Sequence, residues 1–267
     1  MNLQRTGAIV LRQYYLLRGS PARVLPLFAW VAIDMVLWGF ITKYLNSVAS
    51  SGFNFVPTLL GAVLLWDFFI RVMQGVTMAF LEDVWSRNFL NIFATPLRIS
   101  EYVSGLVLSS IGTSSIGMGV MLVLATVVFG LSFFSYGLML FAYLLVLFLF
   151  GIALGITASA IMLRLGPASE WFIWPIPALL SPFAGVFYPL ATLPTWMQYI
   201  SRLLPPAYVF ENMRKIILGG TPSGSELAWG GTLAVLDIFL ACWFFGHIYR
   251  HAVRTGLIAR YSAESLS

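Results

Sequence analysis

The most constraining feature of this chain is the apolar run at residues 136–163, which contains no charged side chain. A helix of about 20 apolar residues crosses a bilayer core about 30 Å thick, so this run is long enough to span a membrane. Comparable runs lie at residues 24–44, 56–80, 103–129, 171–190 and 227–249. Helices satisfy their own backbone hydrogen bonds inside lipid, and these runs are too long for barrel strands. We therefore predict an all-α membrane protein with six transmembrane helices.

The composition excludes a water-soluble fold. Of the 267 residues, 60% are hydrophobic and only 9% are charged, whereas a soluble domain carries about a quarter charged residues. Six spans use roughly half of the chain and leave only short loops between them. We therefore expect one transmembrane domain over residues 1–267.

The distribution of basic residues predicts the orientation, because cytoplasmic loops carry an excess of Lys and Arg. A cytoplasmic N-terminus places on the cytoplasmic side Arg5, Arg12, Arg18, Arg23, Arg87, Arg98, Arg164, Arg250, Arg254 and Arg260. It places outside Lys43, Arg202, Arg214 and Lys215, while Arg71 falls inside the second span. Both termini are therefore predicted to be cytoplasmic. The dispersal of these residues also argues against a nucleic-acid partner.

Residues 1–23 are predicted to form an amphipathic helix on the inner leaflet, in contact with membrane lipids. Its apolar face is formed by Leu3, Val10, Tyr14 and Leu17. Arg5 and Arg12 lie roughly opposite, as in helices that rest at a membrane interface. A basic anchor that precedes the first span is the alternative, and both interpretations are cytoplasmic.

A second amphipathic helix is predicted at residues 82–96, between the second and third spans. Its apolar side chains Trp85, Phe89, Ile92 and Phe93 are spaced at i, i+4, i+7 and i+8. Pro96 ends the helix because the residue before a proline is pushed out of the α region. Such a helix offers a docking face for a partner. A helix that merely rests on lipid headgroups is the alternative.

Prolines interrupt the apolar sequence before the last span, at residues 182–214. They are Pro182, Pro189, Pro194, Pro205 and Pro206, with Trp196, Tyr199 and Tyr208 between or after them at interfacial positions. One straight helix is excluded. We expect broken, partly re-entrant helices on the outer side, where protein or water covers the freed backbone groups.

Four ionisable residues lie near the middle of predicted spans: Asp34, Asp67, Arg71 and Asp237. Each charge costs about 2.5–3.5 kcal/mol to insert there, so these side chains should face protein or water. They form either a structural ion-pair network that joins the first, second and sixth spans or part of a transport pathway.

Catalytic and metal-binding constellations are not evident. His247 and His251 share a helical face, but no third ligand is near them in the sequence. The phosphate-binding motif of ATPases is also absent, since Lys43 follows Thr42 and Lys215 follows Arg214. We therefore expect neither an enzyme nor a resident metal, and any energy from ATP must come from a partner.

Two pairs of small residues permit close helix packing: Gly151 with Gly155, and Ser115 with Gly119. Packing within one bundle is the favoured interpretation, and a seam between two copies is the alternative.

The order of these elements resembles the type-2 ABC export permeases. The shared features are the basic N-terminal helix, six spans, an amphipathic helix ending in Ala94-Thr95-Pro96-Leu97, and a proline-broken outer segment. The sequence LPTWMQYISRLLPPAYVFENMR at residues 193–214 is similar to that family's stretch before the last span. The resemblance covers essentially the whole chain. One departure is Leu204, which stands before Pro205-Pro206 where family members often have Asn.

The resemblance implies a multi-pass permease of the bacterial inner membrane. It implies a dimer, with a second copy of this chain expected, and separate ATP-binding cassette subunits that hold ATP and Mg²⁺. Residues 82–96 would be the coupling helix, with contacts to the ATPase from Glu82, Trp85, Arg87, Phe89, Ile92 and Phe93. The outer gate would include Pro182, Pro189, Pro194, Trp196 and Tyr208. Export of a hydrophobic, amphipathic or lipid-linked substrate would follow.

Two questions stay open at this point. A proton-coupled secondary transporter with a relay of Asp34, Asp67 and Asp237 is the alternative mechanism. Within the export interpretation, a drug and a polysaccharide or glycolipid are both consistent with the 16% aromatic content, because aromatic rings stack on sugars as well as anchor at interfaces.

Overall fold

The computed structural model describes residues 2–48, 55–86, 88–131 and 136–256, and these residues form helices without a strand. Five helices within this part are long and apolar enough to cross a membrane. They are α2 (Pro21–Val48), α3 (Gly61–Trp85) with the π-helical turn Val56–Leu60 before it, α5 (Ile99–Phe129), α6 (Met139–Leu165) and α11 (Gly224–Arg254). The all-α class of membrane protein is therefore confirmed.

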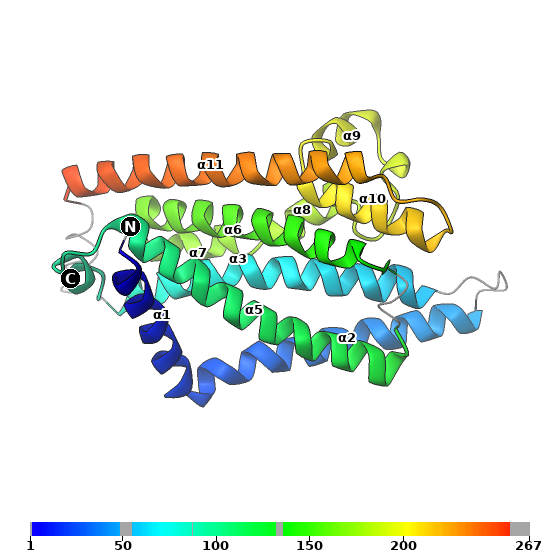
Figure 1. Ribbon diagram of the computed structural model, residues 1–267, viewed down its shortest axis with the longest axis horizontal. Helices are drawn as coiled ribbons and strands as arrows, with labels where there is room; N and C mark the ends of the chain where they lie inside the picture. The colour runs from blue at the N-terminus through cyan, green and yellow to red at the C-terminus, as the bar shows by residue number, and fades with distance from the viewer. Residues whose placement is uncertain (1, 49–54, 87, 132–135, 257–267) are drawn as a thin grey trace.

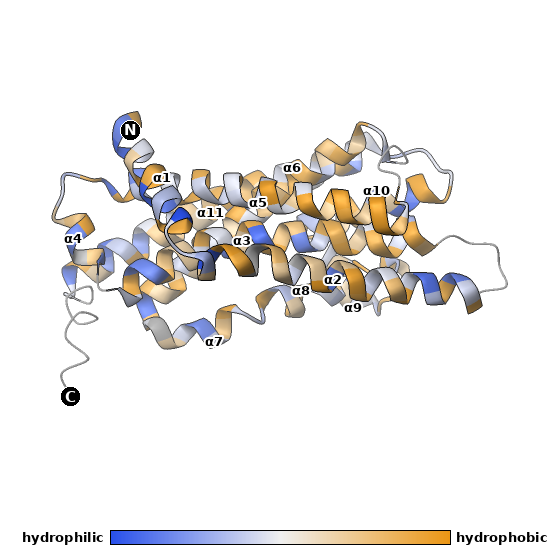
Figure 2. Cartoon of the chain, turned by 90° about the horizontal axis from the view of Figure 1, so that it is seen from below, coloured by the Kyte–Doolittle hydropathy of each residue, from blue (hydrophilic) through white to orange (hydrophobic). Residues whose placement is uncertain are grey.

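The long helices lie side by side along the length of the molecule (Figure 1). The short helices α1 (Leu3–Arg18) and α4 (Phe89–Phe93) lie at one end of this bundle, where α11 also finishes. We name it the α4 end. The helices α9 (Thr195–Ser201) and α10 (Pro205–Ile217) lie at the other end, named the α9 end. In Figure 2, the orange of hydrophobic residues is strongest along the long helices, whereas α1 carries many hydrophilic residues.

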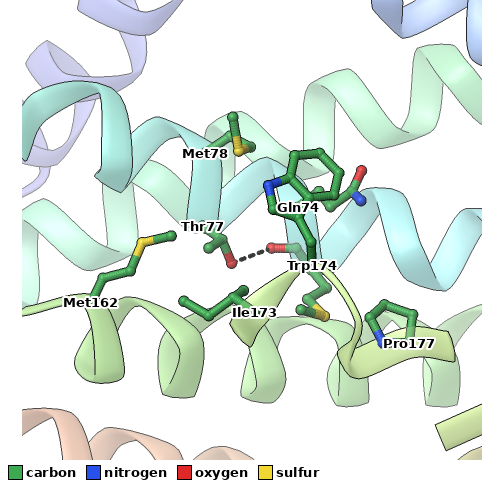
Figure 3. A pocket seen from close by; sticks show the side chains of 8 residues that line it. Gln74, Thr77, Met78, Met162, Ile173, Trp174 and Pro177 are labelled. Atoms are coloured by element: carbon green, nitrogen blue, oxygen red, sulfur yellow. Dashed lines mark hydrogen bonds between the residues drawn. The ribbon is translucent and has the colours of Figure 1, made fainter. Parts of the chain in front are cut away.

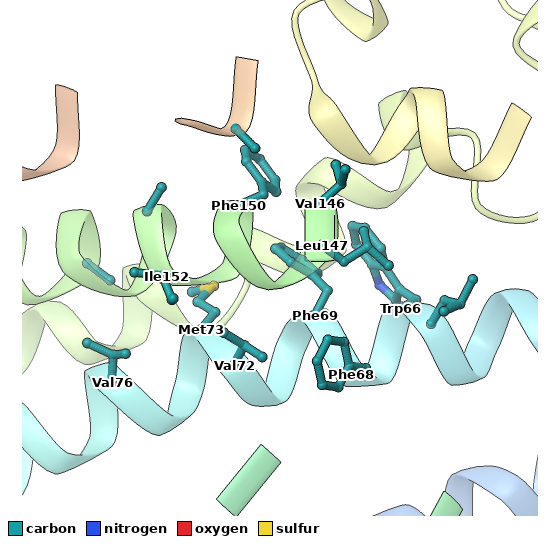
Figure 4. Close-up of a cluster of buried hydrophobic side chains, with 14 of the residues drawn as sticks. Trp66, Phe68, Phe69, Val72, Met73, Val76, Val146, Leu147, Phe150 and Ile152 are labelled. Atoms are coloured by element: carbon teal, nitrogen blue, oxygen red, sulfur yellow. The ribbon is translucent and has the colours of Figure 1, made fainter. Parts of the chain in front are cut away.

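Helix α3 is the centre of the bundle and packs against α5 and α6, and α6 in turn packs against α11. Trp66, Phe69 and Val72 of α3 meet Leu147 and Phe150 of α6 in a continuous apolar layer (Figure 4). Glycines permit the close approach. A Cβ atom on Gly155 of α6 would lie 2.8 Å from the Met73 carbonyl oxygen of α3. The interpretation of Gly151 and Gly155 as packing within one bundle is therefore confirmed, whereas Ser115 and Gly119 are exposed.

The prediction of one continuous fifth span at residues 171–190 is wrong. The chain there forms two short helices, α7 (Glu170–Ile173) and α8 (Ile176–Ala184). Pro175 and Pro177 lack the backbone N–H that a continuous helix needs, which accounts for the break. The two helices still follow one another along the bundle, from the α4 end towards the α9 end (Figures 1 and 2).

The segment at residues 182–214 is broken into short helices, as the prolines predicted. Helix α8 ends at Gly185, whose φ of 62° lies in the left-handed region that glycine adopts readily. The 3₁₀ turn Leu190–Thr192 follows, then α9 directly after Pro194, and α10 with Pro205 at its first position. One side of helix α10 is buried in the protein, and Asn212, Met213 and Arg214 lie among its buried residues.

Candidate functional site

A cavity of about 640 Å³ lies between α1, α2, α3 and α5, with Trp174 of the α7–α8 turn at one side. Its lining combines acidic, basic, hydroxyl, amide and apolar side chains. The residues that carry the argument below are Gln13, Arg23, Trp30, Asp34, Asp67, Arg71, Glu82 and Ser114. Its volume falls in the range of about 300–1,000 Å³ that is typical of small-molecule sites.

Three of the four predicted membrane charges meet in this cavity. Asp34 of α2, Asp67 of α3 and Arg71 of α3 line it and interact electrostatically with one another. Asp237 of α11 does not line the cavity. The network that was predicted to join the first, second and sixth spans therefore joins only the first two. A relay of all three aspartates is likewise not assembled.

Helix α5 supplies the wall behind Arg71. The Arg71 side chain crosses from α3 to α5, and a Cβ atom on Gly117 would lie 3.3 Å from its Cδ atom. Further along the same wall, Ser110 Oγ donates to the Val72 carbonyl oxygen at 2.9 Å. Gly75 of α3 leaves the space for Ser110, since a Cβ atom there would overlap its Oγ. Glycines on both helices thus bring a hydroxyl-bearing face of α5 against the charged face of α3.

Among the lining residues other than Arg71, three buried polar atoms have no hydrogen-bond partner within the described part of the chain. They are Gln13 Nε2, Asp67 Oδ2 and Ser114 Oγ. Gln13 is 6% exposed and Ser114 is 2% exposed. Buried polar groups in folded proteins are nearly always satisfied, by protein, water or ligand. Because these three atoms surround one cavity, we infer that polar groups from outside the chain satisfy their hydrogen bonding.

Polar and aromatic side chains are among the residues that line the cavity towards the α4 end. Arg23 Nε lies 3.4 Å from Glu82 Oε1 at the junction of α2 and α3. Trp174 is held by a 2.8 Å hydrogen bond from its Nε1 to Glu170 Oε1. Beside Gln74 and Met78, Trp174 also borders a much smaller pocket of about 10 Å³ on the α8 side of α3 (Figure 3). Trp174 therefore separates this small pocket from the large cavity.

Helix α1 is fastened to the α4 end by buried ionic contacts. Arg12 Nη2 lies 2.5 Å from Asp83 Oδ1, and Tyr102 Oη donates to Asp83 Oδ2 at 2.7 Å. Glu101 Oε1 accepts from the Asn2 backbone N–H at 2.7 Å, and Arg5 Nη1 lies 3.7 Å from Glu101 Oε2. A helix forms here as predicted, but it covers Leu3–Arg18 and not residues 1–23. Arg5 and Arg12 contact carboxylates of the bundle, whereas Arg18 is exposed.

The face of α1 that packs inward also differs from expectation. Thr6, Ile9 and Gln13 are buried against α5, where Gly105 admits the Ile9 side chain. Leu3 and Tyr14 of the predicted apolar face are exposed, which suits contact with lipid.

The prediction of one helix over residues 82–96 is wrong. Helix α3 continues through Glu82 to Trp85, and α4 covers only Phe89–Phe93 after a turn. Phe89 and Ile92 are buried, and the Phe89 ring contacts Phe80 and Tyr102. Phe93 packs on Tyr249 of α11. The exposed aromatic residue of this region is Trp85, and Arg87 lies outside the described residues.

Aromatic contacts close the bundle on the α9 side of the charges. Trp38 lies one helical turn beyond Asp34 on α2 and stacks on Phe187, with ring centroids 5.0 Å apart. On α3, Trp66 contacts Phe210 of α10 at 6.0 Å between centroids. These four rings lie further towards the α9 end than Asp34 and Asp67 and are not among the residues that line the cavity.

The predicted gate residues occupy several different places near these rings. Pro182 lies inside α8, and Pro189 and Pro194 precede the 3₁₀ turn and α9. Trp196 is exposed, and Tyr208 Oη donates to the Arg202 carbonyl oxygen at 2.7 Å. The segment is held by Glu211, whose Oε1 accepts from the Leu190 backbone N–H and from Arg214 Nη2.

Comparison with protein families decides the class of this molecule. The sequence model of the ABC-2 type transporter family matches residues 9–218. The chain belongs to the ABC-2 type transporter family. This ABC-2 permease is therefore a multi-pass membrane protein and a component of membrane transport. The matched region includes α1 from Ile9 onwards, the whole lining of the cavity and the segment up to α10. No curated protein matches the chain.

The part of the permease that the structure describes holds no group of three or more His, Cys, Asp or Glu side chains placed to bind a metal. His247 stacks on Trp243 of α11, with centroids 6.1 Å apart.

Several residues of the site were not found from the sequence. Gln13, Trp30 and Trp174 line the cavity although nothing in their local sequence marks them. Asp83, which is 1% exposed, was not singled out from the sequence either. A usable signal existed for Ser110 and Ser114, which lie with Ser109 and Thr113 in an otherwise apolar run.

Proposed function

We propose that this chain is the permease subunit of an ATP-driven exporter of the bacterial inner membrane. A hydrophobic, amphipathic or lipid-linked substrate enters the cavity from the cytoplasm or the inner leaflet and leaves on the outer side. Energy comes from a separate ATP-binding cassette subunit that holds ATP and Mg²⁺, and two permease copies assemble with it. In this proposal, both termini and the loop that contains α4 lie in the cytoplasm.

The observation that carries this proposal is the polar cavity at the depth of Asp34 and Asp67. Charged side chains inside a membrane protein mark pathways by default, because lipid does not tolerate them. The cavity reaches the α1–α2 junction near the α4 end, where Arg23 and Glu82 lie. In the opposite direction, the stacked rings of Trp38 and Phe187 lie one helical turn beyond Asp34. A cavity that reaches the end proposed to be cytoplasmic fits substrate entry from that side.

We expect the end of α3 and the loop after it to receive motion from the ATPase. The exposed residues Trp85, at the end of α3, and Asn91 and Thr95 offer a surface for docking. Asp83, buried in the last turn of α3, is bonded to α1 and α5. Displacement of this loop would therefore move helices that border the cavity.

Copurification from native membranes tests the proposal. The full chain, tagged at one end and expressed with the products of the neighbouring genes, should retain an ATPase whose hydrolysis of Mg-ATP changes when the permease is present. A permease that carries out transport without any ATPase, driven only by the proton gradient, would exclude the proposal.

A further inference from the structure

We propose that the cavity binds an amphiphile whose headgroup is a protonated amine, an inference that rests on the permease function proposed above. The headgroup lies between Asp34, Asp67 and Ser114, and the apolar part of the substrate lies along α3 and α1.

The charge of the lining favours a cation. The charged residues among the described lining are Asp34, Asp67, Glu82, Arg23 and Arg71. Arg23 and Glu82 pair with each other at the junction of α2 and α3. Deeper in the cavity, two carboxylates therefore face one guanidinium, which leaves an excess of one negative charge. A charge without a counter-charge is costly at membrane depth. A bound ammonium group removes that cost, whereas an anionic headgroup increases it.

The unsatisfied polar atoms fit the donors of an ammonium group. Asp67 Oδ2 and Ser114 Oγ are buried acceptors without a donor from the described residues. They come from α3 and α5, which face each other across this part of the cavity. An ammonium group carries three N–H donors, and charge-assisted hydrogen bonds to carboxylates are among the strong ones. Gln13 Nε2 is a donor, so it fits an oxygen acceptor elsewhere in the same substrate.

The remainder of the lining fits an apolar body. Leu17, Met78 and Ala79 contribute apolar surface on the side of the cavity nearer to the α4 end, and Ile70 adds to it beside Arg71. Trp30 is 63% exposed at the edge of the cavity, and aromatic faces attract cations as well as apolar chains. A molecule with a small cationic head and a hydrocarbon body satisfies both parts of this surface.

Three amphiphiles with the same tail test the headgroup. The full chain in lipid nanodiscs is titrated with octylammonium, octyl sulfate or octyl glucoside, and its thermal unfolding midpoint is measured. Only octylammonium should give a saturable increase. Asp34→Asn and Asp67→Asn should each weaken its apparent affinity by at least about tenfold, equivalent to about 1.4 kcal/mol. Asp237→Asn, which removes a membrane carboxylate outside the cavity, is the matched control and should bind like the parent.

Three results would overturn the inference. The first is stabilisation of the parent by octyl sulfate to the same extent as by octylammonium. The second is stabilisation by octyl glucoside alone, which would assign the cavity to a sugar headgroup. The third is binding of octylammonium by both Asn variants with the affinity of the parent. If Asp67→Asn does not fold, Asp67→Glu keeps the charge and should retain binding, and Asp34→Asn still decides the question. The titration contains no ATPase, so its outcome is separate from the copurification test of the permease function.

Discussion

Arg12 of α1 and Asp83 of α3 form a two-pronged ion pair across 71 positions of the chain, with N–O distances of 2.5 and 3.1 Å. Asp83 is 1% exposed, and Tyr102 of α5 donates to the same carboxylate. One buried carboxylate thus joins three helices at the α4 end. Gln13, the next residue on α1, lines the cavity. The loop after α3 and the cavity are therefore mechanically connected through α1.

The first prediction concerns the cost of breaking this ion pair. Arg12→Gln leaves the Asp83 carboxylate buried with only the Tyr102 hydroxyl and should destabilise the protein by about 3–5 kcal/mol. The double variant Arg12→Gln/Asp83→Asn should lose less, because no buried charge remains unpaired. Thermal unfolding in detergent measures both. Arg18→Gln, an exposed change in the last turn of α1, is the control. A single variant as stable as this control would contradict the prediction.

The second prediction concerns Trp85, the exposed aromatic residue near α4. Trp85→Ala should fold normally and reduce permease-dependent ATP hydrolysis, because Trp85 is exposed on the loop proposed to dock the ATPase. Trp196→Ala changes an equally exposed tryptophan at the α9 end and should leave hydrolysis unchanged. Equal hydrolysis by both variants would remove Trp85 from the docking surface.

Phe89→Asp provides the third prediction. The Phe89 ring is buried against Phe80, Phe93 and Tyr102. Its loss should cost at least about 3 kcal/mol, since a cavity and a buried carboxylate arise together. We expect little folded protein on size-exclusion chromatography. A folded variant that lacks only ATPase coupling would show instead that Phe89 leaves the interior to dock.

The fold was largely predictable because lipid imposes a strict requirement. Long apolar runs gave five helices, and the prolines gave the breaks in the segment at residues 182–214. The break between α3 and α4 was missed because the apolar spacing of Trp85, Phe89 and Ile92 is unchanged by the turn between them.

The site was less predictable because it depends on which way each helix faces. Asp34 and Asp237 lie at similar depth in their spans, yet only Asp34 lines the cavity. The pairing of Arg12 with Asp83 depends on how α1 folds back on the bundle, and no local pattern determines that. Depth in the membrane can be derived from sequence position, whereas the facing direction requires the packed neighbours.

The fourth prediction concerns closure beyond the charges. The stacking of Trp38 on Phe187 stabilises the closed state of the permease by about 0.5–1.5 kcal/mol beyond the effect of its buried area. Loss of this stacking should therefore increase the population of the open state by up to about tenfold. In a Cys242→Ser background, a cysteine introduced by Thr113→Cys lies in the cavity. A membrane-impermeant maleimide added from outside should label it faster after Trp38→Ala. The neighbouring exposed residue gives the control, Leu37→Ala. Equal labelling rates in both variants would show that the stack is not the barrier.

The last prediction is a double-mutant cycle on Asp67 and Arg71, which lie one turn apart on α3 and attract each other in the cavity. Arg71→Gln alone leaves Asp67 and Asp34 together without their cation, so it should cost more than Arg71→Gln/Asp67→Asn, by as much as about 3 kcal/mol. Asp237→Asn, outside the cavity, should show no coupling to Arg71→Gln. Detergent stability and transport are measured for each variant. Additive losses at Asp67 and Arg71 would mean that the two residues do not interact. If the double variant regains stability but still does not transport, the pair belongs to the pathway. In that variant the balance of buried charge is restored, whereas the groups that meet the substrate are gone.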